Sequence, residues 1–597
     1  MVAGVGAFLQ GLSAQLYPRR PEFSPLPPPP RMPSWLPSYF KQVHNQNSEP
    51  LLPENAAHVR GDDEHDGIEL VLRSRPCRTQ FTHFSSWSRL WIIVIVGVVC
   101  IPATLILSSG QALVPINYHE TVVNHYDKNS SAHAPIDALR GRQSSTLSQA
   151  VARYSLRNNR PPPLNYDRWY DFAQEHRCLI DEYHQISRDF EPFYQLAQED
   201  PAFFKRMVDR GTAKVTRDGS GMTTGRFAGG RFKFTDRQST LYAGDWPRTF
   251  ARFASFMPNM NVVLNGRDEP RVIFDYRRPN MKRAALNTSD RTPFEHAPQS
   301  TARFFKDVVH CLVPDRPIGF TELANDASAF MLASSSTEFT TDMYPVLSMA
   351  KIAPCFADIL VPSEFYYSDS RWAPRYAYPD NIPWDAKIPR LYWRGKSSGG
   401  RISGTNYRAF PRFRAVDIGR ENLDLMDVAL SGFHASLCDD DCDAAAIKAE
   451  YNITGTSTPR ETVYGYKYAL DLDGNSFSGR YLGLLRSGSL VFKVPSPVCI
   501  LQTIELLTRA QTTIFAEYFN DWLRPFEHYI PVLPDLSDLV EKIEWAVAHD
   551  AEARAIQQAG QAVAERVLTD AQNDCYFAAV LLEWGRLQAL ALAEVSA

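Results

Sequence analysis

Residues 464–494 read YGYKYALDLDGNSFSGRYLGLLRSGSLVFKV, and this stretch decides the fold. A strand-like apolar segment leads into a polar turn rich in Gly and Ser, which is followed by a short helical segment and a second apolar strand. The pattern predicts a βαβ unit with a polar loop at the start of the helix. Such a loop presents free backbone N–H groups and the positive end of the helix dipole to an anion. We therefore expect Ser478 and Arg480 to bind a pyrophosphate, although many ordinary βα turns also carry Gly and Ser.

Beyond residue 166, the rest of the chain also alternates between strand-like and helical patterns. Short apolar runs rich in β-branched and aromatic residues separate stretches with helical spacing. These runs are 262–264, 272–274, 359–361, 391–393 and 490–492. Alternation of this kind predicts a parallel α/β architecture. Strong helix formers with apolar residues at i, i+3 and i+4 predict that helices at 551–567 and 577–592 close the chain.

Length and charge limit the class of protein. With 597 residues, the chain exceeds the size at which one hydrophobic core stops growing, so we expect more than one domain. The formal net charge is only −4, so nothing in the charge balance suggests nucleic acid as a partner. Any phosphate chemistry must therefore come from local sites.

An uncharged run from Leu90 to Leu107 is long enough to cross the hydrocarbon core of a bilayer. We predict a single transmembrane helix at 90–108, with a buried core helix as the less favoured alternative. Four arginines precede the run at Arg73, Arg75, Arg78 and Arg89. Basic residues return only at Lys128, so the amino end should be cytosolic.

The segments on either side of this helix differ in composition from the rest. Residues 1–89 are rich in proline and acidic residues, which is typical of a disordered cytosolic tail. Residues 109–165 read as a luminal stem. Seven cysteines lie beyond the predicted helix, in a compartment where disulfides form. N-x-[ST] triplets begin at Asn129, Asn287 and Asn452, on the same side.

Two acidic or cysteine patterns raise the question of a metal. Asp471-Leu-Asp473 resembles the D-x-D motif that holds a metal on donor phosphates in one class of glycosyltransferase. It lies late in the chain and within a strand that runs into the phosphate-type turn, so we reject that role. Cys438 and Cys442 have no second Cys/His pair at ligand spacing nearby. We expect neither a metal nor another cofactor.

Four segments together resemble glycosyltransferase family 90, the capsule-associated and protein O-glucosyltransferase group. They are NVVLNGRDEPRV at 261–272, IPRLYWRGKSSGGR at 388–401, the block from YKYAL to LVFK at 466–493, and PFEHYIPV at 525–532. Their order and spacing are similar to the family over roughly residues 166–570. The resemblance is closest to a membrane-bound, fungal-looking branch of the family.

The resemblance implies a GT-B architecture, with two Rossmann-like domains facing each other across a cleft. The acceptor and base domain would span 166–385, the nucleotide-sugar domain 386–570, and a terminal helix 571–597. It also implies that the Asp of the R-D-x-P segment, Asp268, is the general base of an inverting transfer. Glu269 stands where some relatives carry an aromatic residue, which leaves a second carboxylate as a rival base.

Further residues of the donor site follow from the same resemblance. Arg394 and Gly395 of the W-R-G segment would join Ser478 and Arg480 at the diphosphate, where arginine donors suit the charge of a leaving group. Gly395 would allow close approach of the backbone. His528 and Tyr529 lie in a block for which packing and ligand contact both remain open.

We therefore expect a UDP-sugar-dependent inverting glycosyltransferase that transfers xylose or glucose to a hydroxyl of a glycan or glycoprotein. Xylose is slightly favoured because of the branch resembled and because the chain ends Glu594-Val595-Ser596-Ala597, without an ER-retention signal. The predicted location is the Golgi membrane, with the catalytic part luminal. Two alternatives remain: a protein O-glucosyltransferase of secreted domains, and a catalytically inert membrane adaptor that binds partners through its proline-rich tail.

Overall fold

The structure is a computed structural model. It describes residues 134–202, 204–205, 208, 221–236, 242, 244–272, 295–296, 338–339, 345–352, 356–372, 382–494, 515–533 and 535–593. The chain divides into two units, 1–113 and 114–597, and every described residue lies in the second. The predicted tail and the predicted transmembrane helix at 90–108 lie outside these residues. Within the described ranges, no helix is both long and apolar enough to span a bilayer.

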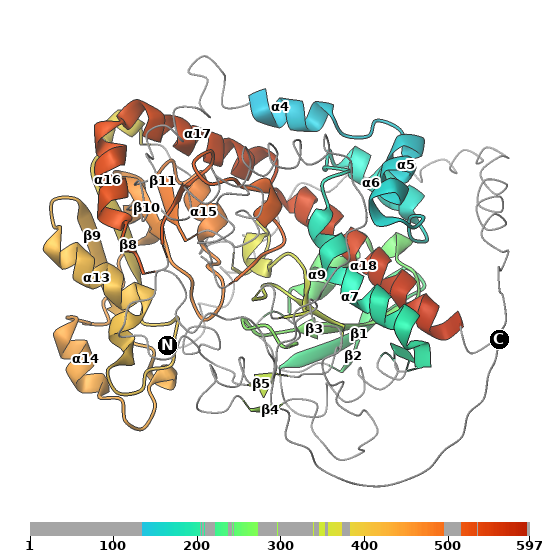
Figure 1. Cartoon of the computed structure of the whole chain (residues 1–597), viewed down its shortest axis with the longest axis horizontal. Coiled ribbons are helices and arrows are strands. Elements are labelled where there is room, and N and C mark those ends of the chain that lie inside the picture. The colour runs from blue at the N-terminus through green and yellow to red at the C-terminus, as the bar shows by residue number, and fades with distance from the viewer. Residues whose placement is uncertain are drawn as a thin grey trace, which may run out of the picture. The chain divides into compact units, whose positions relative to one another are not determined.

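Four helices open the described chain (Figure 1). They are α4 (Ala134–Gly141), α5 (Leu147–Asn158), α6 (Tyr166–Glu175) and α7 (His184–Glu199). Helix α5 begins at an N-cap, because the Thr146 hydroxyl accepts a hydrogen bond from the backbone N–H of Gln149. It ends at Asn159, which adopts the left-handed conformation. Both α4 and α5 lie within the predicted stem, and their buried Ile136 and Ala150 belong to the hydrophobic core.

The first large sheet combines antiparallel and parallel strands. Its order is β2 (Arg231–Asp236), β1 (Met222–Ala228), β3 (Met260–Asn265), β6 (Val346–Ser348) and β7 (Ile359–Leu360). Strands β3, β6 and β7 run parallel, whereas β1 pairs antiparallel with both β2 and β3. Gly229 and Gly230 turn the β1–β2 hairpin with positive φ angles. A further antiparallel pair is formed by β4 (Glu295–His296) and β5 (Glu338–Phe339).

The second sheet is entirely parallel, as the sequence predicts. Its order is β12 (Ile530–Pro531), β11 (Leu490–Lys493), β10 (Tyr466–Asp471), β8 (Ile388–Lys396) and β9 (Met426–Gly432). Helix α15 (Tyr481–Arg486) connects β10 to β11, which confirms the predicted βαβ unit. Helix α13 (Pro411–Glu421) packs on β9, and α14 (Ala444–Glu450) follows β9 in sequence. The mixed α/β class is therefore confirmed.

Short helical segments complete the connections between these elements. They are α9 (Trp246–Ala251) and the 3₁₀ segments η1 (Ala254–Phe256), η3 (Glu364–Tyr366), η4 (Trp384–Ala386), η5 (Asn406–Ala409), η6 (Ala435–Leu437), η7 (Arg460–Gly465) and η10 (Asn520–Trp522).

Three helices close the chain: α16 (Leu539–Ala548), α17 (Asp550–Arg566) and α18 (Asp570–Ala593). The two helices predicted near the end are thereby confirmed. Helix α17 packs on α15 and β11, but α18 returns to the start of the described chain and packs on α6 and α7 (Figure 1). Trp169 of α6 donates a hydrogen bond from Nε1 to the carbonyl oxygen of Cys575, at 2.9 Å. A disulfide between Cys178 and Cys575 joins the same two regions.

The second disulfide that the structure describes links Cys438 to Cys442. Both sulfur atoms of the candidate metal pair are thus used in a covalent bond. Cys311, Cys355 and Cys499 lie outside the described residues.

We predict that a fragment beginning at residue 131 is more stable than one beginning at residue 166. Tyr154 of α5 donates a hydrogen bond to Glu583 of α18, and Arg586 donates one to the Tyr154 hydroxyl at 2.6 Å. The shorter fragment loses these bonds and the buried Ile136, so its free energy of unfolding should fall by about 2–5 kcal/mol. Thermal and denaturant unfolding of the two purified fragments measure the difference. Tyr154→Phe in the longer fragment, as a smaller perturbation, should cost about 1–3 kcal/mol; equal stability of the two fragments would contradict a structural role for α4 and α5.

Candidate functional site

The loop between β10 and α15 carries the predicted pyrophosphate residues. Arg480 stands at the N-cap position of α15. Its Nη1 donates a hydrogen bond to the carbonyl oxygen of Arg394, at 2.8 Å, which links the ends of the neighbouring strands β10 and β8. Its Nη2 is buried and has no hydrogen-bond partner among the residues that the structure describes. A buried guanidinium N–H without an acceptor is costly, so this atom is suited to receive an anionic ligand.

Arg412 of α13 joins the loop that follows β8 to the loop that follows β10. Its guanidinium donates to the carbonyl oxygens of Lys396 (2.8 Å), Asp473 (2.8 Å) and Leu472 (3.3 Å), and to the Ser398 hydroxyl (2.7 Å). Because β8 and β10 are parallel neighbours, the loops that follow them leave the same edge of the sheet. One buried cation therefore fixes how far apart these loops lie.

The loops approach so closely that glycine is required at Gly399. Its φ angle is +106°, and a Cβ there would lie 3.2 Å from the carbonyl oxygen of Gly474. Gly395 serves a different contact: a Cβ at that position would lie 2.5 Å from the ring of Trp393. Gly395 thus makes room for a buried tryptophan, whereas Gly399 allows the two loops to approach each other.

Arg394 lies near the end of β8, and its guanidinium is already bound. Nη2 forms an ion pair with Asp427 of β9, and Nη1 donates to the Asp427 carbonyl oxygen at 2.7 Å. Tyr466 donates a second hydrogen bond to the Asp427 carboxylate. Burial raises the pKa of Asp427, but the hydrogen bonds from Tyr466 and Arg394 outweigh it and lower the pKa below its usual value. The hydrogen bond from Arg480 reaches the backbone carbonyl oxygen of Arg394.

Ser478 is buried and holds the loop from inside. Its hydroxyl donates to Oδ1 of Asp471, whose Oδ2 accepts a hydrogen bond from Lys493 at 2.7 Å. Lys493 also lies 3.7 Å from Asp473. Burial lowers the pKa of Lys493, but Asp471, Asp473 and Glu517 together raise it above its usual value. A single ammonium group therefore lies beside both carboxylates of the D-x-D segment and offsets part of their negative charge.

Two residues of this region gave no signal in the sequence. The hydroxyl of Tyr366, in η3, lies 2.5 Å from Oε1 of Glu517 and 3.2 Å from the carbonyl oxygen of Ser478. Burial raises the pKa of Glu517 to about 8, although Lys493 and the hydrogen bond from Tyr366 lower it in part. Tyr366 and Glu517 are separated by 151 positions, so only the fold brings them together.

Asp268 and Glu269 lie in the loop after β3, and the two residues differ in how far they are exposed to solvent. The Glu269 side chain belongs to the interior, with only 1% of the residue exposed, whereas Asp268 is partly exposed. Burial raises the pKa of Asp268 to about 6; the charge of Glu269 adds to this rise, and a hydrogen bond from Tyr242 opposes it. At neutral pH Asp268 is mostly ionised, partly exposed and able to accept a proton.

Hydrogen bonds made by Asn265 of β3 and by Asp358, which directly precedes β7, keep this loop in place. Asn265 donates from Nδ2 to the Glu269 carbonyl oxygen at 2.7 Å and to the Ser348 hydroxyl at 3.1 Å. The Asp358 carboxylate accepts the backbone N–H groups of Arg271 and Val272, at 2.9 and 2.8 Å. The base loop is therefore held by buried bonds on both sides of Asp268.

Phe365 connects the Asp268 loop to the Arg480 loop. Its ring stands edge-on to Tyr242, with 5.5 Å between centroids, and Tyr242 donates its hydroxyl hydrogen to Asp268. The same ring lies against Gly479, where a Cβ would come within 2.5 Å of it. Among the described residues, no hydrogen bond or ion pair joins the Asp268 side chain directly to Arg394, Ser478 or Arg480.

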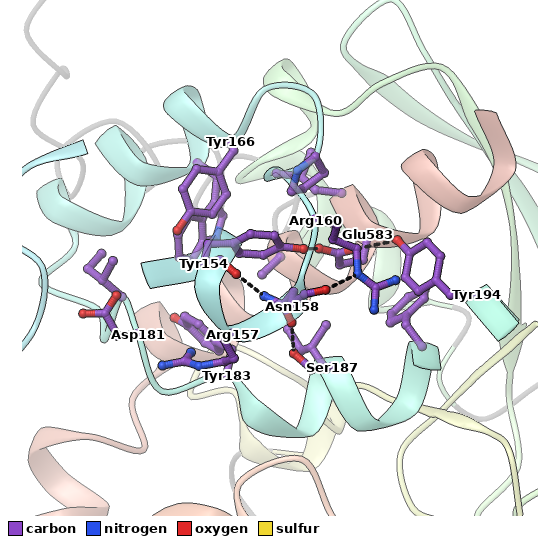
Figure 2. Close-up of a pocket in the computed structure, with 17 residues that line it drawn as sticks. Tyr154, Arg157, Asn158, Arg160, Tyr166, Asp181, Tyr183, Ser187, Tyr194 and Glu583 are labelled. Atoms are coloured by element: carbon purple, nitrogen blue, oxygen red, sulfur yellow. Dashed lines mark hydrogen bonds between the residues drawn. The ribbon is translucent and has the colours of Figure 1, made fainter. Parts of the chain in front are cut away.

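A pocket formed by α5, α6, α7 and α18 lies apart from these residues (Figure 2). Tyrosines and a tryptophan make up much of its wall, and Glu583 accepts hydrogen bonds from Tyr154 and Tyr194 there. Neither Asp268 nor any of the predicted donor-site residues lines it. His528, in the last of the four resembling segments, is also internal: its Nδ1 accepts the Arg524 N–H at 2.8 Å, and burial lowers its pKa to about 4.

Residues 377–594 match the family described as Glycosyl transferase family 90. This matched part is called the family 90 domain below. The domain contains Arg394, Gly395, Ser478 and Arg480, whereas Asp268 and the segment at 261–272 precede it. The resemblance expected over residues 166–570 is thus confirmed for the family and located in the later part of the chain.

Curated relatives agree with this assignment over a limited length. Protein O-glucosyltransferase 2 of Danio rerio is 31% identical over 205 residues, which cover 34% of this chain and 34% of the relative. Protein O-glucosyltransferase 3 of Homo sapiens is 28% identical over 206 residues, 34% of this chain and 33% of the relative. An uncharacterized protein 027R of Frog virus 3 is 30% identical over 237 residues, 36% of this chain and 23% of the relative. The matches to the two glucosyltransferases thus span about a third of their length.

We predict that Arg412→Met strongly destabilises the family 90 domain. The substitution keeps the apolar stem but leaves the carbonyl oxygens of Lys396, Leu472 and Asp473 without this donor, which should cost about 2–5 kcal/mol. Arg414→Met, on the same helix, is the matched control because the Arg414 side chain makes one described hydrogen bond, to the Asp535 carbonyl oxygen at 2.8 Å. Denaturant unfolding of both variants tests the comparison. Equal losses for Arg412→Met and Arg414→Met would show that Arg412 does not hold the loops.

Proposed function

We propose that the chain is an inverting glycosyltransferase that moves a sugar from a UDP-sugar to a hydroxyl group of a protein or its glycan. The observation that carries this proposal is the position of Arg480 within the family 90 domain. Its buried Nη2 lacks an acceptor at the edge of the sheet where α/β folds bind nucleotides. A diphosphate oxygen is the acceptor that this guanidinium fits best.

The donor half of the reaction requires a group that stabilises the leaving diphosphate. Negative charge grows on the diphosphate as its bond to the anomeric carbon breaks, so a fixed guanidinium stabilises the transition state more than the ground state. Arg480 supplies this charge, and Ser478 shapes the loop through its hydrogen bond to Asp471. Arg394 contributes its carbonyl oxygen, which orients Arg480, while its side chain stays bound to Asp427.

The acceptor half requires a base. We assign this role to Asp268, which takes the proton from the acceptor hydroxyl while that oxygen bonds to the anomeric carbon and the diphosphate leaves from the opposite face. Partial exposure and a pKa of about 6 support the assignment, because the carboxylate is ionised at neutral pH and within reach of solvent. Glu269 is less suited because its side chain is buried. Two Rossmann-like domains of the GT-B type would then supply donor and base from separate halves.

Glucose and xylose remain the two candidate sugars. The names of the curated relatives favour glucose and a protein acceptor, whereas the branch resembled in the sequence favours xylose. The two disulfides support an oxidising, luminal compartment, and we propose the Golgi membrane with residues 90–108 as the anchor. An inert adaptor is the second candidate function. It would not explain why Arg480 has a buried guanidinium N–H without a hydrogen-bond partner among the described residues.

We expect transfer to proceed without a divalent cation. Lys493 already places a positive charge beside Asp471 and Asp473, where a metal would otherwise bind. UDP release measured with each of several UDP-sugars should therefore be unchanged by EDTA. Loss of activity in EDTA and its recovery with Mn²⁺ would return the two aspartates to a metal-binding role.

Asp268→Asn and Arg480→Ala should produce defects of different kinds. The first variant keeps the size of the side chain but removes the proton acceptor, so transfer should fall by about 10²- to 10⁴-fold while UDP affinity is retained. The second should weaken both UDP binding and turnover, because it removes a charge-assisted contact to the diphosphate. Calorimetric UDP binding and single-turnover transfer separate these effects.

Glu269→Gln is the control for the base assignment. If Asp268→Asn retains near-normal transfer and Glu269→Gln is inactive, the base lies one residue further along the chain. If neither the wild-type chain nor either variant releases UDP with any sugar tested, an inert adaptor is the better description.

A further inference from the structure

Tyr242, which belongs to none of the sequence motifs, contacts the candidate base Asp268. The residue is fully buried, and its hydroxyl donates a hydrogen bond to Oδ1 of Asp268. Among the described residues, none donates a hydrogen bond to the other carboxylate oxygen, Oδ2. One oxygen of the carboxylate is therefore held, and the other remains available to a substrate.

The ring of Tyr242 is itself fixed by two aromatic neighbours. Phe365 stands edge-on at 5.5 Å between centroids, and Trp372 lies at 5.8 Å with an interplanar angle of 50°. Phe365 and Trp372 also contact each other at 5.1 Å. A buried ring held in this way has little rotational freedom, so its hydroxyl defines one direction for the Asp268 carboxylate.

We propose that Tyr242 is the positioning residue of the general base: it holds Oδ1 of Asp268 so that Oδ2 takes the proton of the acceptor hydroxyl. The proposal rests on the proposed function of Asp268. Phe365 extends the arrangement, because its ring contacts both Tyr242 and the Gly479 segment next to Arg480. The orientation of the base and the position of the donor loop thus depend on the same aromatic group.

The electrostatics of Tyr242 and Asp268 predict the direction in which loss of the Tyr242 hydroxyl shifts the pKa of Asp268. Burial raises the pKa of Asp268 to about 6, and the charge of Glu269 raises it further. The hydrogen bond from Tyr242 acts in the opposite direction, because it stabilises the ionised carboxylate. Among the described residues, Glu269 and Tyr242 are the titratable groups that shift the pKa of Asp268; Phe365 and Trp372, which pack on Tyr242, carry no charge. Removal of the Tyr242 hydroxyl should therefore make Asp268 harder to ionise.

The test is the pH profile of kcat/KM for Tyr242→Phe in the full-length chain. Activity requires ionised Asp268, so the wild-type rate should fall as the pH drops through about 6. In Tyr242→Phe this acid limb should move to higher pH by roughly half a unit to one unit, the equivalent of one hydrogen bond. The kcat should fall several-fold even above the limb, because the carboxylate is no longer oriented, and UDP affinity should be unchanged.

Tyr194→Phe is the matched control. Tyr194 is also buried and donates its hydroxyl to a carboxylate, that of Glu583, at 2.7 Å in the pocket of Figure 2. Its loss should lower the melting temperature without moving the acid limb. If Tyr242→Phe does not fold, Trp372→Leu loosens the same ring and should lower kcat and shift the limb in the same direction.

The outcomes separate this proposal from the one on which it rests. An acid limb that stays in place, or moves to lower pH, in a folded Tyr242→Phe variant overturns the positioning role. So does an unchanged profile in Trp372→Leu when Tyr242→Phe fails to fold. Near-normal transfer by Asp268→Asn instead overturns the base assignment itself, whatever Tyr242→Phe shows.

Discussion

The proposed donor site depends on the hydrogen bonds that the buried guanidinium of Arg412 donates. Parallel strands β8 and β10 end at one edge of the sheet, and the loops that follow them turn the carbonyl oxygens of Lys396, Leu472 and Asp473 toward the same small volume. Without a donor between them these oxygens would repel one another and remain without hydrogen bonds. Arg412 satisfies all three, and the resulting separation lets Arg480 reach the carbonyl oxygen of Arg394.

The cations around this edge are distinguished by what already holds them. Arg394 is bound to Asp427, Lys493 to Asp471, and Arg412 to the loop carbonyl oxygens. Arg480 differs because, although Nη1 donates a hydrogen bond, its buried Nη2 has no hydrogen-bond partner among the described residues. The sequence shows four basic residues spread over positions 394–493, and only the partners that the fold gives them show which positive charge remains for a ligand. This difference is why we propose Arg480, rather than Arg394, as the side chain that binds the diphosphate.

The sequence predicted the parts of the fold that depend on local pattern. The spacing of hydrophobic residues and the positions of glycine and serine predicted β10, α15 and β11 correctly, because each of these signals depends on only a few neighbouring residues. It did not predict the antiparallel β1–β2 hairpin, whose strands expose charged residues, nor the bonds from Tyr242 to Asp268 and from Tyr366 to Glu517. In those pairs the partner of the carboxylate is an aromatic residue, which in a sequence is read as core. The polar use of a buried tyrosine becomes visible only when its hydroxyl is seen to reach a carboxylate.

The return of α18 shows why the family 90 domain is not a separate folding unit. The match ends at residue 594 and therefore includes α18, yet this helix packs on α6 and α7, which lie nearly two hundred residues before the match begins. Its Tyr576, Phe577 and Leu581 are fully buried in that contact region. A chain cut at residue 377 would expose this apolar surface to water, at about 25 cal/mol for each Å². The earlier half that supplies Asp268 and Tyr242 is therefore also needed to bury the end of the domain that supplies Arg480, so the two parts of the proposed site fold together.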